Sequence, residues 1–214
     1  MKILAVQSRM GIGDTVIFLP FIKALSKKFN SPISILVKEN SKANQYLHQT
    51  KYIDKILILE RDNKTNNRHG GFFGIFKLAN DLKKYKFDKI FIFNSSLRFN
   101  LVAKISGIPK IYQYPLFTKN KQHIIETPKK FLKENLHLDI NEDPEVQIDS
   151  DLISKAAQKF QIDKNTTNIL LGIGGSGPTK RIPAKTFLSV IDKISNMKNC
   201  RFFLATGKAN EEQE

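Results

Sequence analysis

Five short apolar runs in the first half of the chain predict buried β-strands. Each run holds Ile, Leu, Val or Phe almost without interruption, whereas a half-exposed strand would alternate polar and apolar positions. The runs are KILAVQS (2–8), ISILVKE (33–39), KILILE (55–60), KIFIFN (89–94) and KIYQYP (110–115). Such continuous runs are typical of parallel strands that are covered on both faces.

Longer segments with helical periodicity lie between these runs. They cover residues 15–29, 41–48, 72–85, 96–106 and 121–136. The β-α-β-α order predicts an α/β fold with a doubly wound, Rossmann-like parallel sheet. We expect the aromatic stretch GGFFGIFKLA (70–79) to contribute to the core of this fold, because clustered aromatic residues are more often buried than exposed.

The acidic segment LDINEDPEVQIDSD (138–151) interrupts a basic chain and predicts the end of the first domain. A helix, LISKAAQKFQI, follows it, and then a new strand-helix-strand pattern begins at NILLGIGG. We therefore expect residues 1–150 to form one domain, and residues 151–214 to form a linker helix and the beginning of a second. A βαβ unit of this size is too small to bury both faces of its own sheet. It is either incomplete or docks on the first domain.

The chain is strongly basic, with 35 Lys and Arg against 20 Asp and Glu and a net charge of +15. The cations are spread along the sequence, which fits either a solvated basic surface or attraction to an anionic partner. Nucleic acid, a phosphorylated glycan and a membrane surface are the candidates. No signature of a nucleic-acid-binding fold is visible, so nucleic acid is not the expected partner.

Cysteine usage and hydropathy predict a cytoplasmic protein. Cys200 is the only cysteine, so no internal disulfide can form. No apolar run approaches the ~18 to 20 residues of a membrane span, and MKILAVQS is too short for a signal peptide. Peripheral contact with a membrane surface stays open. No His, Cys, Asp or Glu cluster has the spacing of a metal site, so we expect no protein-bound metal.

The loop SRMGIGDTV after the first predicted strand carries a candidate catalytic carboxylate, Asp14. Ligands of open α/β sheets bind beyond the carboxyl ends of the strands. Asp14 can either cap the following helix or face the cleft as a general base. Pro20 favours a helix that begins later, which would free Asp14 from a capping role.

The segment GIGGSGPTKRIPAKTF contains G-x-G-x-x-G at Gly172, Gly174 and Gly177. A dinucleotide site is not expected, because the helix is predicted to begin only near Pro183 and the next strand, FFLATG, ends without an acidic residue. The loop still combines backbone amides, a helix N-terminus and cationic residues, which suit a pyrophosphate. The candidate donor-binding residues in it are Gly174, Gly175, Ser176, Gly177, Thr179 and Lys180.

Two further loops, ERDNKTNNRHGG and NSSLRFN, follow predicted strands and are basic. Arginine side chains clamp phosphates and carboxylates, so these loops predict a site for an anionic acceptor on the same sheet edge as Asp14. The alternative is a solvated basic surface. The candidate acceptor-binding residues are Gly13, Arg61, Arg68, Ser96 and Arg98.

In this order, the segments resemble glycosyltransferase family 9, the lipopolysaccharide heptosyltransferases. The resemblance rests on GIGDTVIFLPFIKAL, FDKIFIFNSSLRFNLVAKISGIPKIYQYP, GIGGSGPTKRIPAKTF and FFLATGKANEE. It implies a GT-B architecture of two Rossmann-like domains. It also implies transfer of a sugar, typically heptose, from a nucleotide-sugar such as ADP-heptose to a lipid-anchored core oligosaccharide.

The resemblance also assigns roles to individual residues. It implies that Asp14 is the general base of an inverting transfer, and that Lys180 contacts the pyrophosphate. Glu211 or Glu212 would contact the ribose, and Arg98 would face the acceptor. Neither a metal nor a cofactor besides the nucleotide-sugar is implied. Members of the family are longer, so we expect the second domain to be incomplete here. A non-catalytic basic module that binds nucleic acid or anionic headgroups is the alternative.

Overall fold

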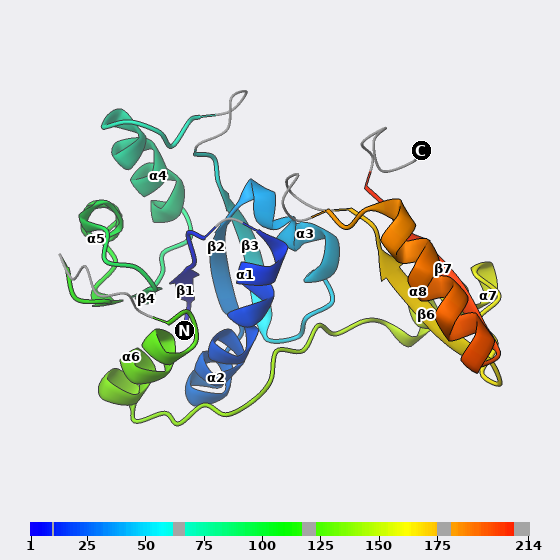
Figure 1. The fold of residues 1–214 in the computed structure, drawn as a ribbon. Coiled ribbons are helices and arrows are strands. Elements are labelled where there is room, and N and C mark those ends of the chain that lie inside the picture. Colours follow the sequence, from blue (N-terminus) through cyan, green and yellow to red (C-terminus); the bar gives the residue numbers. More distant parts are fainter. Residues whose placement is uncertain (10, 62–66, 117–122, 175–180, 208–214) are drawn as a thin grey trace. The chain divides into compact units, whose positions relative to one another are not determined.

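The chain divides into two compact units, Met1–Asp149 and Ser150–Glu214, in the computed structural model (Figure 1). The structure describes residues 1–9, 11–61, 67–116, 123–174 and 181–207.

The first unit is built on one parallel sheet in the strand order β3-β2-β1-β4-β5. The five predicted strands are all present, with shorter bounds at most ends. They are β1 (Ile3–Val6), β2 (Ile33–Lys38), β3 (Ile53–Leu59), β4 (Lys89–Ile92) and β5 (Lys110–Gln113). The chain leaves the centre of the sheet in both directions, so the strand order reverses between β1 and β4. In open α/β sheets, ligands bind beyond the carboxyl ends of the two strands at such a reversal, and we refer to this region as the crevice.

Helices connect the strands of the first unit. They are α1 (Ile12–Ile17), α2 (Leu19–Phe29), η1 (Glu39–Ser41), α3 (Ala43–Tyr46), α4 (Phe73–Lys83), α5 (Leu97–Ile105) and α6 (Glu126–Leu136). The single helix predicted over 15–29 is wrong, because the chain breaks at Phe18 into two helices. Pro20 lies in the first turn of α2. Backbone N–H groups in the first turn have no acceptor within the helix, so the missing N–H of proline costs no helical hydrogen bond there.

Alternate residues of the central strand explain the continuous apolar runs. Ile3 and Ala5 belong to one buried cluster, which also contains residues of α2 and α6. Leu4 and Val6 belong to a second cluster on the opposite face, with residues of α4 and α5. Both faces of the sheet are therefore covered, which confirms the predicted α/β architecture.

The expectation that the aromatic stretch 70–79 is core is wrong for three of its residues. Ile75 and Leu78 of α4 are buried, but Phe72, Phe73 and Phe76 are exposed. The reason is the close approach of α4 to the preceding loop at Gly74. A Cβ at this position would lie 2.3 Å from the carbonyl carbon of His69. This contact fixes the rotation of the helix and leaves the phenylalanines outside.

The second unit contains one parallel strand pair and two helices. Its elements are α7 (Ser150–Lys159), β6 (Thr167–Gly172), α8 (Ala184–Met197) and β7 (Cys200–Ala205). None of its described residues is buried. This is the result expected for a βαβ unit that cannot cover both faces of a sheet.

Candidate functional site

Three loops meet at the carboxyl end of the sheet where the strand order reverses. The Gln113 side chain at the end of β5 donates hydrogen bonds to the carbonyl oxygens of Asn94 and Ser96, at 3.1 and 2.9 Å. The Asn94 side chain donates to the hydroxyl oxygen of Ser8 at 3.2 Å. Side-chain amides therefore hold the loops after β1, β4 and β5 together, and they fix Ser96 at the N-terminus of α5.

The loop after β1 is fixed by Gln7, which is buried. Its side-chain amide donates to the backbone oxygen of Asp14 at 3.1 Å, and its side-chain oxygen accepts from the backbone N–H of Arg9 at 2.7 Å. One buried side chain thus spans the glycine loop and sets the position of the first turn of α1. Gln7 was not among the predicted site residues, although its place directly after a strand was a usable signal.

Asp14 is not the helix cap that the sequence left as an alternative. The N-cap of α1 is Gly11, whose φ of 133° lies in a region that favours glycine, and Asp14 is in the first turn. The Asp14 side chain is half-buried. No described residue donates a hydrogen bond to its carboxylate or forms an ion pair with it. Gly13, also in this turn, is exposed. Asp14 therefore lies in the first turn after β1, near the crevice, and its carboxylate has no partner among the described residues.

The base of the basic loop after β3 is closed by Glu60 and His69. The Glu60 N–H donates to His69 Nδ1 at 3.1 Å, and the His69 N–H donates to the Glu60 carbonyl oxygen at 2.9 Å. Because Nδ1 is an acceptor, the proton is on Nε2, which donates to the Asp81 carboxylate at 3.1 Å. His69 is thus a buried structural residue of this loop.

Two of the predicted acceptor residues hold this loop in place. Arg68 forms an ion pair with Asp81 at 2.8 Å. Arg98 donates to the carbonyl oxygen of Gly71 at 2.7 Å and also to that of His69. Arg61 directly follows Glu60 at the base of the loop. Arg61 and Arg68 therefore belong to this loop, and hydrogen bonds tie Arg98 of α5 to it.

The charge around Asp81 follows from this packing. Partial burial tends to raise the pKa of Asp81, but the hydrogen bond from His69 and the neighbouring Arg68 guanidinium outweigh it. The net result is a pKa below the ordinary value of 3.8. Asp81 is therefore an anionic anchor for the loop rather than a proton donor at neutral pH.

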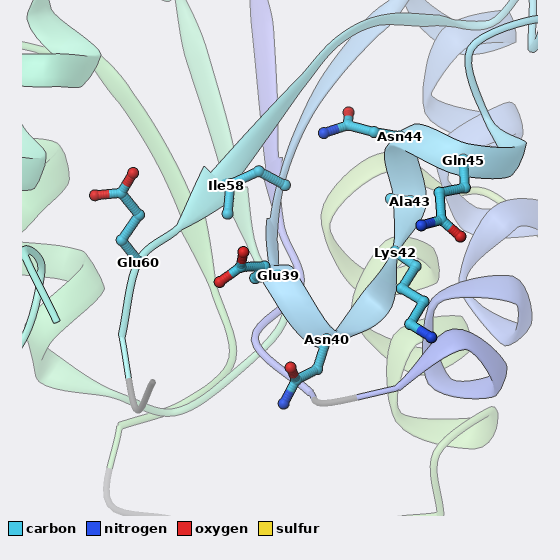
Figure 2. Close-up of a pocket in the computed structure, with 8 residues that line it drawn as sticks. All are labelled: Glu39, Asn40, Lys42, Ala43, Asn44, Gln45, Ile58 and Glu60. Carbon is cyan, nitrogen blue, oxygen red and sulfur yellow. The ribbon is translucent and has the colours of Figure 1, made fainter. Parts of the chain in front are cut away.

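A polar pocket of about 570 Å³ lies beyond the ends of β2 and β3 (Figure 2). Its lining residues come from η1, α3 and the end of β3. They are Glu39, Asn40, Lys42, Ala43, Asn44, Gln45, Ile58 and Glu60. The side-chain amides can donate and accept hydrogen bonds, the carboxylates accept them and the lysine donates them. This mixture suits a ligand with several neighbouring hydroxyl groups.

This pocket belongs to the same sheet edge as Asp14. Helix α1 packs against η1, which forms one wall of the pocket. The sequence interpretation missed these residues because it assigned nearly all of them to two strands, 33–39 and 55–60, and to a helix over 41–48. Their position immediately after two parallel strands was the available signal.

Of the predicted donor-binding residues, the structure describes only Gly174. Gly174 follows β6 and is exposed. Gly175, Ser176, Gly177, Thr179, Lys180, Glu211 and Glu212 lie outside the described residues. Helix α8 begins at Ala184 after Pro183. The helix therefore does not open within the glycines, in agreement with the argument against a dinucleotide site.

Neither a metal cluster nor a spanning helix is found in the part of the chain that the structure describes. There, no three His, Cys, Asp or Glu side chains are grouped as a metal ion requires. The described helices are all too short or too polar to cross a bilayer.

No family model and no curated protein matches this chain. Its fold is similar to that of solved glycosyltransferases. A glycosyl transferase family 9 structure from Veillonella parvula matches with a TM-score of 0.73 at 18% identity, covering 95% of this chain and 62% of that one. ADP-heptose LPS heptosyltransferase II from E. coli matches with a TM-score of 0.68 at 16% identity, covering 99% and 66%. E. coli heptosyltransferase WaaC with ADP matches with a TM-score of 0.64 at 14% identity, covering 100% and 70%.

These similarities confirm the fold that the sequence resemblance implied, a GT-B-type Rossmann-like domain followed by the first elements of a second. At this level of identity they establish the fold alone. The chain spans about two thirds of the length of these structures.

Proposed function

We propose that this chain belongs to a glycosyltransferase that moves a sugar from a nucleotide diphosphate sugar to an acceptor hydroxyl with inversion. The observation that carries the proposal is Asp14, a carboxylate with no described partner, near the crevice of a fold shared with solved glycosyltransferases. Heptose is the proposed sugar and ADP-heptose the proposed donor. A lipid-linked oligosaccharide of the lipopolysaccharide-core type is the proposed acceptor.

In this proposal Asp14 accepts the proton of the acceptor hydroxyl as its oxygen attacks the anomeric carbon. A carboxylate is a weak base for a free alcohol, but the proton becomes acidic as the new C–O bond forms. Gln7 holds the backbone of Asp14, so the carboxylate needs little reorganisation to act. The bond to the nucleoside diphosphate breaks on the opposite face of the sugar, which inverts the anomeric centre.

Residues on both sides of Asp14 would hold the acceptor. Arg61, Arg68 and Arg98 supply the positive charge that an acceptor with phosphates or carboxylates requires. Gly13, in the first turn of α1, and Ser96, the N-cap of α5, follow β1 and β4, where the acceptor oligosaccharide would pass. The pocket beside η1 supplies donors and acceptors for the hydroxyl groups of a neighbouring sugar.

The donor side of the proposal rests on the loop after β6. Backbone amides from Gly174 to Gly177, with Thr179 and Lys180, would stabilise the charge on the departing diphosphate. Glu211 or Glu212 would bind the ribose. No metal and no cofactor is required by this scheme. Contact with the cytoplasmic face of the membrane, where a lipid-linked acceptor lies, completes the proposal.

Replacement of Asp14 by Asn tests the catalytic role. The nearly isosteric amide cannot take up the proton, so we expect kcat to fall by about 10²-fold or more. Affinity for ADP-heptose should stay unchanged, because donor binding uses other residues. The measurements are ADP release with a core-oligosaccharide acceptor and calorimetric titration with ADP-heptose.

Glu126→Gln is the matched control, because Glu126 is also an acid in the first turn of a helix, α6. It removes a charge from a helix N-terminus without touching the crevice, and turnover should not change. Equal loss of turnover in both variants, or parallel loss of donor affinity in Asp14→Asn, would contradict the role of Asp14 as base. Binding of generic RNA with a steep salt dependence and no response to nucleotide-sugars would favour the alternative of a binding module.

A further inference from the structure

Helices α4 and α5 present an apolar surface to solvent. Five apolar side chains of the two helices are exposed, and so is that of Phe72, which directly precedes α4. They are Phe72 (68% exposed), Phe73 (76%), Phe76 (48%), Leu97 (45%), Leu101 (38%) and Ile105 (44%). We refer to these six residues as the α4–α5 surface.

The exposure is imposed by the packing of the two helices. On α4, Ile75, Leu78 and Leu82 fill the core, and Gly74 lies too close to the His69 backbone for the helix to rotate. On α5, Phe99 and Val102 face the same core. The positions between these buried residues must point outward, and in this chain they are apolar.

The three phenylalanines form one group. The ring centroid of Phe72 lies 6.0 Å from that of Phe73 and 5.7 Å from that of Phe76, both in edge-to-face arrangements. Helices α4 and α5 are neighbours (Figure 1). The hydrogen bond from Arg98 to the Gly71 carbonyl oxygen ties the beginning of α5 to the turn before α4. The apolar residues of both helices therefore lie on one side of the sheet.

The segment of the chain that carries the α4–α5 surface is basic. Residues 67–110 contain nine Lys and Arg but only two carboxylates, Asp81 and Asp88. Asp81 is paired with Arg68 and Lys84, and Asp88 accepts a hydrogen bond from the Lys2 backbone N–H. The exposed lysines on the two helices and at the end of α4 are Lys77, Lys83, Lys84 and Lys104.

We propose that the α4–α5 surface docks on an anionic lipid bilayer, with its phenylalanines at the level of the headgroups. Aromatic and aliphatic side chains that flank lysines are the composition of helices that bind in the membrane interface, where each cation gains from anionic lipid. A protein partner fits less well, because lysine is depleted in the centre of protein interfaces. This inference deepens the proposed function, since the proposed acceptor is anchored in a bilayer.

The chain contains no tryptophan, so a single substitution gives a unique fluorescent probe. Phe73→Trp should emit as an exposed indole in buffer and shift to shorter wavelength when vesicles of phosphatidylcholine and phosphatidylglycerol are added. Pure phosphatidylcholine vesicles should give a much smaller shift, and added salt should reduce it. Phe160→Trp is the control, because Phe160 is an exposed phenylalanine of the second unit and also lies next to a lysine.

Sedimentation with the same vesicles tests the residues. The triple variant Phe72→Ser, Phe73→Ser, Phe76→Ser should bind at least roughly tenfold more weakly, because three apolar anchors are lost. Lys77→Glu with Lys104→Glu should also weaken binding, whereas Lys130→Glu on α6 should not. All these side chains are exposed, and circular dichroism checks that the variants fold.

Three outcomes would overturn the inference. They are unchanged vesicle binding by the triple serine variant, no binding by the wild-type chain, and a Phe73→Trp emission already shifted in buffer because another surface covers it. A concentration-dependent dimer that the triple variant abolishes would assign the surface to a second copy of the chain. The vesicles contain neither donor nor acceptor, so failure here is distinct from failure of the proposed transferase activity.

Discussion

At the scale of single residues, Asp81 links stability to pH. Its pKa is lower in the folded protein than its ordinary value, despite the opposing effect of burial, because His69 donates to it and Arg68 lies beside it. The ionised form therefore stabilises the fold at pH above about 4, the pKa of an unfolded Asp. This contribution is lost as the pH falls through the lower pKa of the folded state.

Asp81→Asn should reduce the free energy of unfolding at pH 7 by about 1 kcal/mol, because His69 would donate to a neutral rather than a charged acceptor. The difference from wild type should shrink as the pH falls below about 4. Urea denaturation at a series of pH values measures both. Asp139→Asn is the control, since the Asp139 pair with Lys133 is exposed and should contribute little at any pH. A difference between Asp81→Asn and wild type that stays constant through the acid range would contradict this account.

At the scale of elements, Gly74 sets how closely α4 approaches the loop after β3. A Cβ there would lie 2.3 and 2.4 Å from the His69 carbonyl carbon and oxygen. Gly74→Ala should therefore destabilise the protein by about 1–3 kcal/mol. Gly13→Ala is the matched control, because Gly13 is also in a helix and its Cβ would meet nothing within 4 Å. Thermal unfolding of both variants measures the contrast, and equal stability of the two would show that α4 can shift.

Strands that are buried on both faces of the sheet could be predicted well from the sequence. Continuous apolar runs predicted all five strands. The runs of β1, β2 and β4 fit best, because these strands are almost wholly buried and a strand covered on both faces leaves no polar alternation. The helix over 15–29 was predicted as one, since nothing in its periodicity marks the break at Phe18. The exposure of Phe72, Phe73 and Phe76 could not be predicted, because it follows from a backbone approach at Gly74 that exists only in three dimensions.

The candidate site, too, could be predicted only in part. The rule that ligands bind beyond strand ends located the loops of Asp14 and Arg98 from the sequence. The roles of Gln7 and His69 depend on their burial and on how the fold places their hydrogen-bond partners, so composition alone does not indicate them. The pocket residues after β2 were missed for the same reason, because a polar helical turn shows no sign of the cavity beside it.

At the scale of the whole molecule, the two units differ in the size of their hydrophobic cores. The first unit has a buried cluster on each face of its sheet, whereas no described residue of the second is buried. The segment that precedes the boundary belongs to the first unit. Ile140 is 5% exposed in the first cluster, and Glu142 forms ion pairs with Lys23 and Lys27. The Asp149 N–H donates to the Gln49 side chain at 2.9 Å.

A fragment of residues 1–149 should therefore unfold cooperatively with the same urea midpoint as residues 1–214, because it keeps every described buried residue. A fragment of residues 1–137 should be less stable by at least about 2 kcal/mol, since it loses the buried Ile140 side chain and the Glu142 ion pairs. Hydrogen exchange on the whole chain should show strong protection in β1, β2 and β4, with β6 and β7 exchanging almost as an unfolded chain does. Protection of β6 and β7 as strong as that of β1, β2 and β4 would contradict this division, because it would require the second unit to have a core of its own or to share that of the first.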